Sequence, residues 1–114
     1  MDLSKLKLGK LTKISAVNFP AHIDPGLTSA KTPEVLLYFI AKQGDVERFV
    51  ETCRKLDLPR DNRVVMIYQK GNKGLNRDTI IGPFREGRYK DLKLKAPMLC
   101  ALSDSLSAFV MQKV

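Results

Sequence analysis

Two long apolar runs, separated by a segment with the apolar spacing of a helix, dominate the hydrophobic pattern of this chain. Residues 35–41 (VLLYFIA) are apolar throughout and rich in β-formers, which is typical of a strand buried on both faces. Residues 63–69 predict a second buried strand, and residues 12–18 predict a shorter one before both. Between the two buried strands, the spacing predicts a helix that Asp45 caps and that runs to about Leu56. Its apolar positions are Val46, Phe49, Val50, Cys53 and Leu56. We expect that face to pack on Leu37, Phe39, Val65 and Ile67.

The last seventeen residues, 98–114, predict two apolar strands folded back on each other around Asp104 and Ser105. A short helix is expected over residues 77–81, where Gly82 and Pro83 should stop it. Residues 20–33 contain three prolines, which argues against a long helix there. The sheet face beside that segment would then stay partly apolar.

A strand–helix–strand order with this spacing predicts a right-handed parallel crossover. We therefore expect residues 1–114 to form a single α/β domain with a truncated, mostly parallel sheet and a C-terminal antiparallel hairpin. The longest apolar run has seven residues, whereas a membrane helix needs about 20. No signal-peptide core precedes it, so we expect a cytoplasmic protein without membrane association.

The distribution of charge along the chain points to one candidate binding region. The chain has a formal net charge of +8, from 20 basic and 12 acidic residues. The excess lies in residues 70–95, which hold eight basic and three acidic residues. A positive field of this kind attracts phosphates and acidic surfaces, and it is equally typical of a solubilising face.

The loop at residues 70–77 (KGNKGLNR) is the best candidate for binding within this block. It follows a buried strand and precedes a helix, the position where α/β sheets place ligands. Its glycines would let the backbone turn around an anion, which the amides of residues 74–76 would contact. It lacks the Gly-Lys-Ser/Thr ending of a Walker loop. The candidate anion-binding residues are Lys70, Lys73, Gly74, Asn76 and Arg77.

Catalytic or metal chemistry is not indicated. Cys53 and Cys100 both occupy apolar positions, which is typical of packing thiols. His22 and Asp24 could form an acid–base pair, but no serine or cysteine is identifiably placed beside them. We predict no catalytic residue, no metal site and no cofactor.

The chain resembles a small family of uncharacterised bacterial proteins with a methyltransferase-like, Rossmann-like core. The matching features are Asn-Phe-Pro at residues 18–20, the run at 35–41, the strand at 64–68 with its Lys-Gly-rich loop, Leu-Asn-Arg-Asp at 75–78, and the closing pattern at 100–110. The resemblance implies a fold and no activity. A working methyltransferase also needs a glycine-rich turn after its first strand and an acid after the next one. Here residues 18–26 contain one glycine and two prolines, and the strand at 35–41 ends in Lys42 and Gln43.

Two functions follow as hypotheses. The first is a non-enzymatic binding module that recognises a phosphate-bearing or acidic partner through residues 70–95. The partner would be an anionic ligand, a nucleic acid or an acidic protein, and Phe84 and Tyr89 could stack on bases. The alternative is a degenerate S-adenosylmethionine-dependent methyltransferase-like protein that still binds a nucleoside cofactor. The sequence also leaves open a homodimer in which a second copy covers the apolar sheet face beside residues 21–33.

Overall fold

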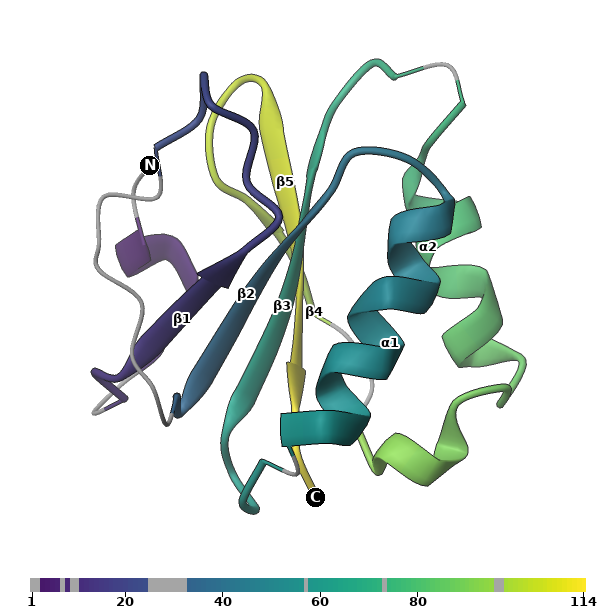
Figure 1. The fold of residues 1–114 in the computed structure, drawn as a ribbon. Coiled ribbons are helices and arrows are strands. Elements are labelled where there is room, and N and C mark those ends of the chain that lie inside the picture. The colour runs from purple at the N-terminus through teal and green to yellow at the C-terminus, as the bar shows by residue number, and fades with distance from the viewer. Residues whose placement is uncertain are drawn as a thin grey trace.

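The computed structural model describes residues 3–6, 8, 11–24, 33–56, 58–72, 74–95 and 98–114. Within them, five strands and two α-helices form a small α/β fold (Figure 1). The strands are β1 (Ile14–Val17), β2 (Val35–Ile40), β3 (Arg63–Gln69), β4 (Met98–Ala101) and β5 (Leu106–Gln112). The helices are α1 (Gly44–Leu56) and α2 (Arg77–Arg85), with the short 3-10 helices η1 (Leu3–Leu6) and η2 (Lys90–Leu92). None of the described helices is both long and apolar enough to cross a membrane.

The sheet is mixed, with the strand order β1-β2-β3-β5-β4. β1, β2 and β3 pair in parallel, whereas β5 pairs antiparallel with β3 on one side and with β4 on the other. The C-terminal antiparallel hairpin is therefore confirmed. The prediction of a mostly parallel sheet is not, because the pairings among the described strands divide evenly between the two kinds. The reason is that β5 inserts between β3 and β4, so that both of its edges make antiparallel pairs.

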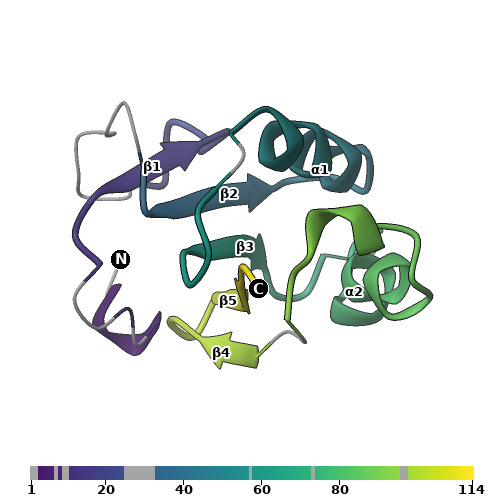
Figure 2. The same cartoon turned by 90° about the horizontal axis from the view of Figure 1, so that it is seen from below.

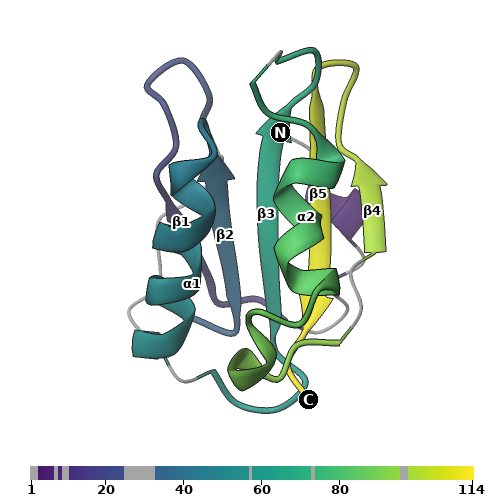
Figure 3. The same cartoon turned by 90° about the vertical axis from the view of Figure 1, so that its right-hand side faces the viewer.

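Both α-helices cover the same face of the sheet (Figure 3). Phe49 of α1 is fully buried there with Leu36, Met66 and Phe109 beneath the helices. The apolar face predicted for this helix is confirmed, but the predicted strand partners are wrong. Leu37, Phe39, Val65 and Ile67 lie in a second cluster, on the opposite face. Both faces of β2 and β3 are apolar, and a uniformly apolar strand carries no signal for which alternate set meets the helix.

The second face is buried within the chain. Leu6 of η1 and Leu102 and Leu106 of the hairpin join the buried residues of β2, β3 and β5, and half-buried residues around β1 pack on them. Figure 2 shows η1 and the segments around β1 on the side of the sheet away from the helices. The residues of β2, β3 and β5 in this cluster are all buried, so these strands do not present the uncovered apolar face that was expected. Residues 25–32, the centre of the proline-broken stretch, lie outside the described residues.

Helix α2 continues through the residues expected to stop it and ends at Arg85. Pro83 has no N–H to donate to the carbonyl of Thr79, four residues earlier. The side chain of Gln43, in the β2–α1 turn, donates to that carbonyl instead, with Nε2 2.8 Å from the oxygen. The end of the helix is a Schellman motif, in which Gly87 N–H donates to Phe84 O and Arg88 N–H to Pro83 O. Gly87 has a φ of +84°, which explains why a glycine stands there.

Candidate anion-binding surface

The loop between β3 and α2 is held by its own side chains. Gly71 adopts a φ of +80° and turns the chain away from β3. The side-chain oxygen of Asn72 then accepts a hydrogen bond of 3.1 Å from Gly74 N–H, and its backbone carbonyl accepts one of 3.2 Å from Leu75 N–H. Asn72 thus occupies two of the amides that were expected to contact an anion.

The backbone amides in the first turn of α2 are likewise capped by side chains of the chain itself. Asn76 Oδ1 accepts from Asp78 N–H at 2.9 Å and from Thr79 N–H at 3.0 Å. In return, Thr79 Oγ1 accepts from Asn76 N–H at 3.1 Å, which completes a capping box. The amides of Gly74, Leu75 and Asn76 therefore all have acceptors within the chain. Asn76 is a capping residue here, and any anion would have to meet side-chain cations rather than these amides.

The two described cations of the predicted site, Lys70 and Arg77, have partners of their own. Lys70 Nζ donates to the carbonyl of Ser103 in the β4–β5 turn, at 3.0 Å. The exposed side chain of Arg77 has its Nε 3.9 Å from Asp78 Oδ1, at the outer limit of an ion pair. Lys73 lies outside the described residues.

Arg77 instead lines a groove of about 220 Å³ between α2 and the edge strand β4. Ile81 and Phe109, both buried, form its apolar floor, and Leu99 of β4 forms its far side with 47% of its surface exposed. The remaining lining residues are charged residues of α2: Arg77, Asp78 and Arg85.

A second hollow, of about 200 Å³, adjoins this groove at Arg85. It is lined by the cationic side chains of Arg85, Lys90 and Lys95 and by the apolar or aromatic side chains of Phe84, Tyr89, Leu94 and Met111. None of the three cations has an ion-pair partner among the described residues. Phe84 and Tyr89 pack on each other, with ring centroids 4.9 Å apart, and on the core, so they are not free stacking platforms. We call the two adjoining hollows, with Arg77, Arg85, Lys90 and Lys95, the basic surface.

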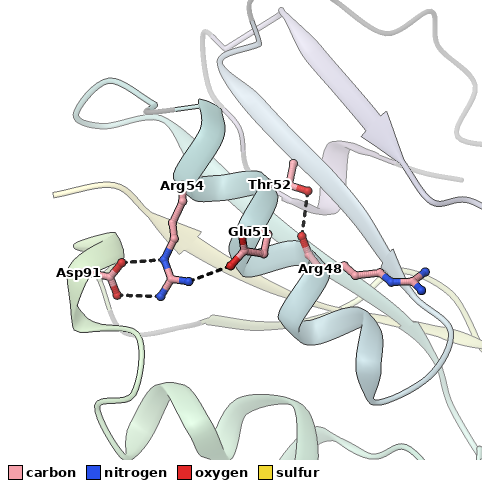
Figure 4. Close-up of polar contacts among 5 residues, drawn as sticks. All are labelled: Arg48, Glu51, Thr52, Arg54 and Asp91. Atoms are coloured by element: carbon pink, nitrogen blue, oxygen red, sulfur yellow. Dashed lines mark hydrogen bonds and ion pairs between the residues drawn. The ribbon is translucent and has the colours of Figure 1, made fainter.

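An ion pair fixes the segment that carries Lys90. Arg54 of α1 donates to both carboxylate oxygens of Asp91 in η2, at 2.9 Å and 3.4 Å, and to Glu51 at 3.1 Å (Figure 4). The hydrogen bond from Arg54 lowers the pKa of Asp91, because it stabilises the charged carboxylate. Asp91 is thus the acid in this basic stretch that faces α1 rather than the basic surface.

A larger and more open groove runs along the other side of α1, and sequence reasoning did not identify it. It is lined by Lys42 and Tyr38 and by one stripe of α1: Gly44, Glu47, Arg48, Glu51, Thr52 and Lys55. Burial raises the pKa of Tyr38, and nearby Asp45 raises it further. Cations and acids alternate along this stripe, so it has no preference for an anion. The carboxylate of Asp45 is buried and accepts hydrogen bonds from the amides of Ala41 and Lys42, which places it in the β2–α1 turn and not in the groove.

The residues considered for catalysis lie in three different parts of the fold. His22 and Asp24 are exposed in the loop after β1, and the side chain of His22 makes no hydrogen bond among the described residues. Burial raises the pKa of Cys53 to about 12, which makes its thiol a poor nucleophile at neutral pH. Cys100, at the edge of the sheet, has its Sγ 3.0 Å from the carbonyl oxygen of Lys5. In the part of the chain that the structure describes, no three His, Cys, Asp or Glu side chains form a group that could hold a metal ion.

Sequence reasoning found the charge block but not its geometry. Arg85, Lys90 and Lys95 were counted in the block, yet nothing in their spacing shows that they line adjoining hollows. Comparisons of the chain with models of protein families, with curated proteins and with solved structures found no match.

Proposed function

We propose that this chain is a non-enzymatic binding module whose basic surface recognises an acidic or phosphate-bearing partner. The observation that carries the proposal is the position of Arg85 between two adjoining hollows, with Arg77 on one side and Lys90 and Lys95 on the other. Three of these four cations have no ion-pair partner among the described residues. Cations grouped around apolar hollows are more typical of recognition than of a solubilising face, where both signs are interspersed.

A charge-removal experiment tests this proposal. Arg85→Gln, Lys90→Gln removes two charges from the basic surface, whereas Lys55→Gln, Arg60→Gln removes the same two residue types from exposed positions at and beyond the end of α1. The affinity for poly-uridine and for heparin is measured over a range of salt concentrations. We expect the first variant to bind more weakly and to flatten the logarithmic salt slope for poly-uridine by about 1.4, because about 0.7 is lost per missing phosphate contact on a single strand.

The control variant should keep the wild-type slope. Equal losses in the two variants would show that only net charge matters, and the basic surface would then have no specific role. Unchanged binding in both variants would also contradict the proposal.

A second candidate is the degenerate methyltransferase-like protein that retains a nucleoside cofactor. Strand direction supports it: β1 to β4 run one way and β5, between β3 and β4, runs the other. The polar residues at the ends of β1 and β2 oppose it. Asn18 donates to Phe39 O at 2.8 Å, and the carboxylate of Asp45, the first acid after β2, accepts from amides of the β2–α1 turn rather than standing free for ribose hydroxyls. A rise in the melting temperature with S-adenosylmethionine or S-adenosylhomocysteine, and none with polyanions, would favour this candidate.

A further inference from the structure

Strand β4 forms one edge of the sheet and leaves backbone groups unpaired by any described strand (Figure 3). Leu102 N–H donates to Leu106 O, and in the same register Cys100 and Met98 lie opposite Ala108 and Val110, so these alternate residues bond inward to β5. Met98 and Cys100 face β5 in this pattern. The amides and carbonyls of Leu99 and Ala101 therefore point away from the sheet, where another strand could pair with them.

The residues of this edge do not block pairing. β4 has the sequence MLCA, with no charged residue and no proline, and Met98 and Leu99 are exposed, at 45% and 47%. Natural edge strands are commonly protected by a charge, a proline or a covering element. η1, the element that contacts β4 through Lys5 and Cys100, lies on the face opposite the α-helices rather than along the edge (Figure 2).

The groove between α2 and β4 lies directly beside this edge. Its positive charges favour an acidic strand over a second copy of this chain. A second copy of the chain would bring another Arg77 and Arg85 against the same groove, in a protein with a net charge of +8. An acidic strand would meet those cations with opposite charge. Asp78 offsets them in part, but its 3.9 Å separation from Arg77 and the exposure of both side chains leave the guanidinium free to turn toward a ligand.

We propose that an extended acidic segment of a partner protein adds to β4 as a further strand, with alternate side chains in the groove between α2 and β4. The inference rests on the proposed function and specifies its partner. Backbone hydrogen bonds to the edge would supply affinity, and the groove would supply selectivity, as in other cases of strand addition.

The spacing of the two arginines sets the pattern of the segment. Arg77 and Arg85 are eight residues apart on α2, which corresponds to roughly 12 Å at 1.5 Å per residue. An extended strand covers that length in about four residues, at roughly 3.3 Å each. Acids at positions i and i+4 would therefore reach the two arginines. Because strand side chains alternate, position i+2 would face Ile81, Leu99 and Phe109 and should be apolar.

Two blocked peptides of identical composition test this pattern. One contains Glu-Thr-Val-Thr-Glu between Gly-Ser flanks, and the other contains Thr-Glu-Val-Glu-Thr, in which the acids and the valine fall on opposite faces of a strand. Dissociation constants are measured by fluorescence anisotropy on the full chain. We expect the first peptide to bind about tenfold more tightly, the combined effect of two exposed ion pairs. Arg77→Gln, Arg85→Gln should remove that difference, and Asp78→Asn should increase it.

Backbone methylation separates strand addition from simple charge attraction without altering the protein. In an added strand, alternate N–H groups point to β4 and the others point to solvent. N-methylation of one alternate set in the first peptide should abolish binding, and methylation of the other set should preserve it. Loss with both sets, tolerance of both sets, or equal affinity of the two isomers would overturn the inference.

The salt-slope experiment distinguishes this failure from failure of the proposed function. If Arg85→Gln, Lys90→Gln still weakens polyanion binding selectively while the peptides show no preference, the basic surface binds anions but does not add a strand. Competition with single-stranded RNA tests the acidic-protein assignment. If the RNA displaces the first peptide and has a higher affinity than the peptide, that assignment is overturned.

Discussion

At the scale of single residues, the two thiols show how burial changes the chemistry of one residue type. Cys53 lies on the buried face of α1, whereas Cys100 lies on the edge strand β4. Both occupy apolar positions in the sequence, and only their places in the fold separate them. The difference has a measurable consequence for pH dependence.

Cys53 should make the protein less stable at alkaline pH. Its pKa rises from an ordinary value of 9.0 to about 12 in the folded state, because burial disfavours the thiolate. The unfolded chain therefore releases this proton first, so the stabilisation is complete below pH 9 and is lost as the pH rises toward 12. Between pH 8 and pH 10, the wild type should lose about 1.4 kcal/mol more unfolding free energy than Cys53→Ala.

Urea titrations at the two pH values measure this difference, and other alkaline titrations cancel because both proteins share them. Parallel pH profiles for the wild type and Cys53→Ala would show that the thiol is not buried in solution. As an independent check, iodoacetamide should label Cys100 in the native protein and Cys53 only in denaturant.

At the scale of elements, α2 contains a proline that the rest of the chain accommodates. Pro83 leaves the carbonyl of Thr79 without its helical donor, and Gln43 supplies one from the β2–α1 turn. The helix can therefore reach Arg85, which places that cation between the two hollows of the basic surface. A side chain outside the helix thus supports the turn of α2 that carries Arg85.

Gln43→Ala should lower the unfolding free energy by about 0.5–1 kcal/mol, because one hydrogen bond is lost at an exposed position. The same substitution in a Pro83→Ala background should cost less, since the new Ala N–H can donate to Thr79 O. Urea unfolding of the four proteins measures the coupling between the two sites. Lys42→Ala serves as the neighbouring control, and additive effects of Gln43→Ala and Pro83→Ala would contradict this role for Gln43.

At the scale of the whole molecule, the chain buries both faces of its sheet by itself. The helices cover one face, and η1, the hairpin and the segments around β1 cover the other (Figures 1 and 2). The original reason to expect a homodimer, an uncovered apolar face, is therefore gone. The exposed apolar surface that the structure describes is concentrated at β4 and the C-terminus, where Met98, Leu99 and Val114 lie.

The protein should consequently be monomeric at neutral pH. A pair of copies joined through β4 would place like charges from both α2 helices together, in molecules that each carry +8. Multi-angle light scattering at increasing protein concentration should give a mass of about 12.8 kDa throughout. A concentration-dependent rise toward twice that mass would show that β4, or another surface, joins two copies after all.

The sequence by itself determined the five strands, the two α-helices and their order, but not the two short 3-10 helices. Helical spacing located α1 and its buried face, continuous apolar runs located β2 and β3, and turn residues located the final hairpin. These signals are local, because they depend on the period of apolar residues and on backbone preferences over a few positions. The charge block at residues 70–95 was also visible in the sequence, because it is a local excess of basic residues.

Only the tertiary structure decided which surfaces these elements present. β2 and β3 are apolar on both faces, so the sequence could not show that Leu36 and Met66, rather than Leu37 and Val65, meet the helices. The predicted anion loop satisfies its own amides through Asn72 and Asn76, and the extension of α2 depends on a hydrogen bond from a residue 36 positions earlier. The groove between α2 and β4 arises because β5 inserts between β3 and β4. Each of these outcomes depends on contacts between distant segments, which no local pattern of residues specifies.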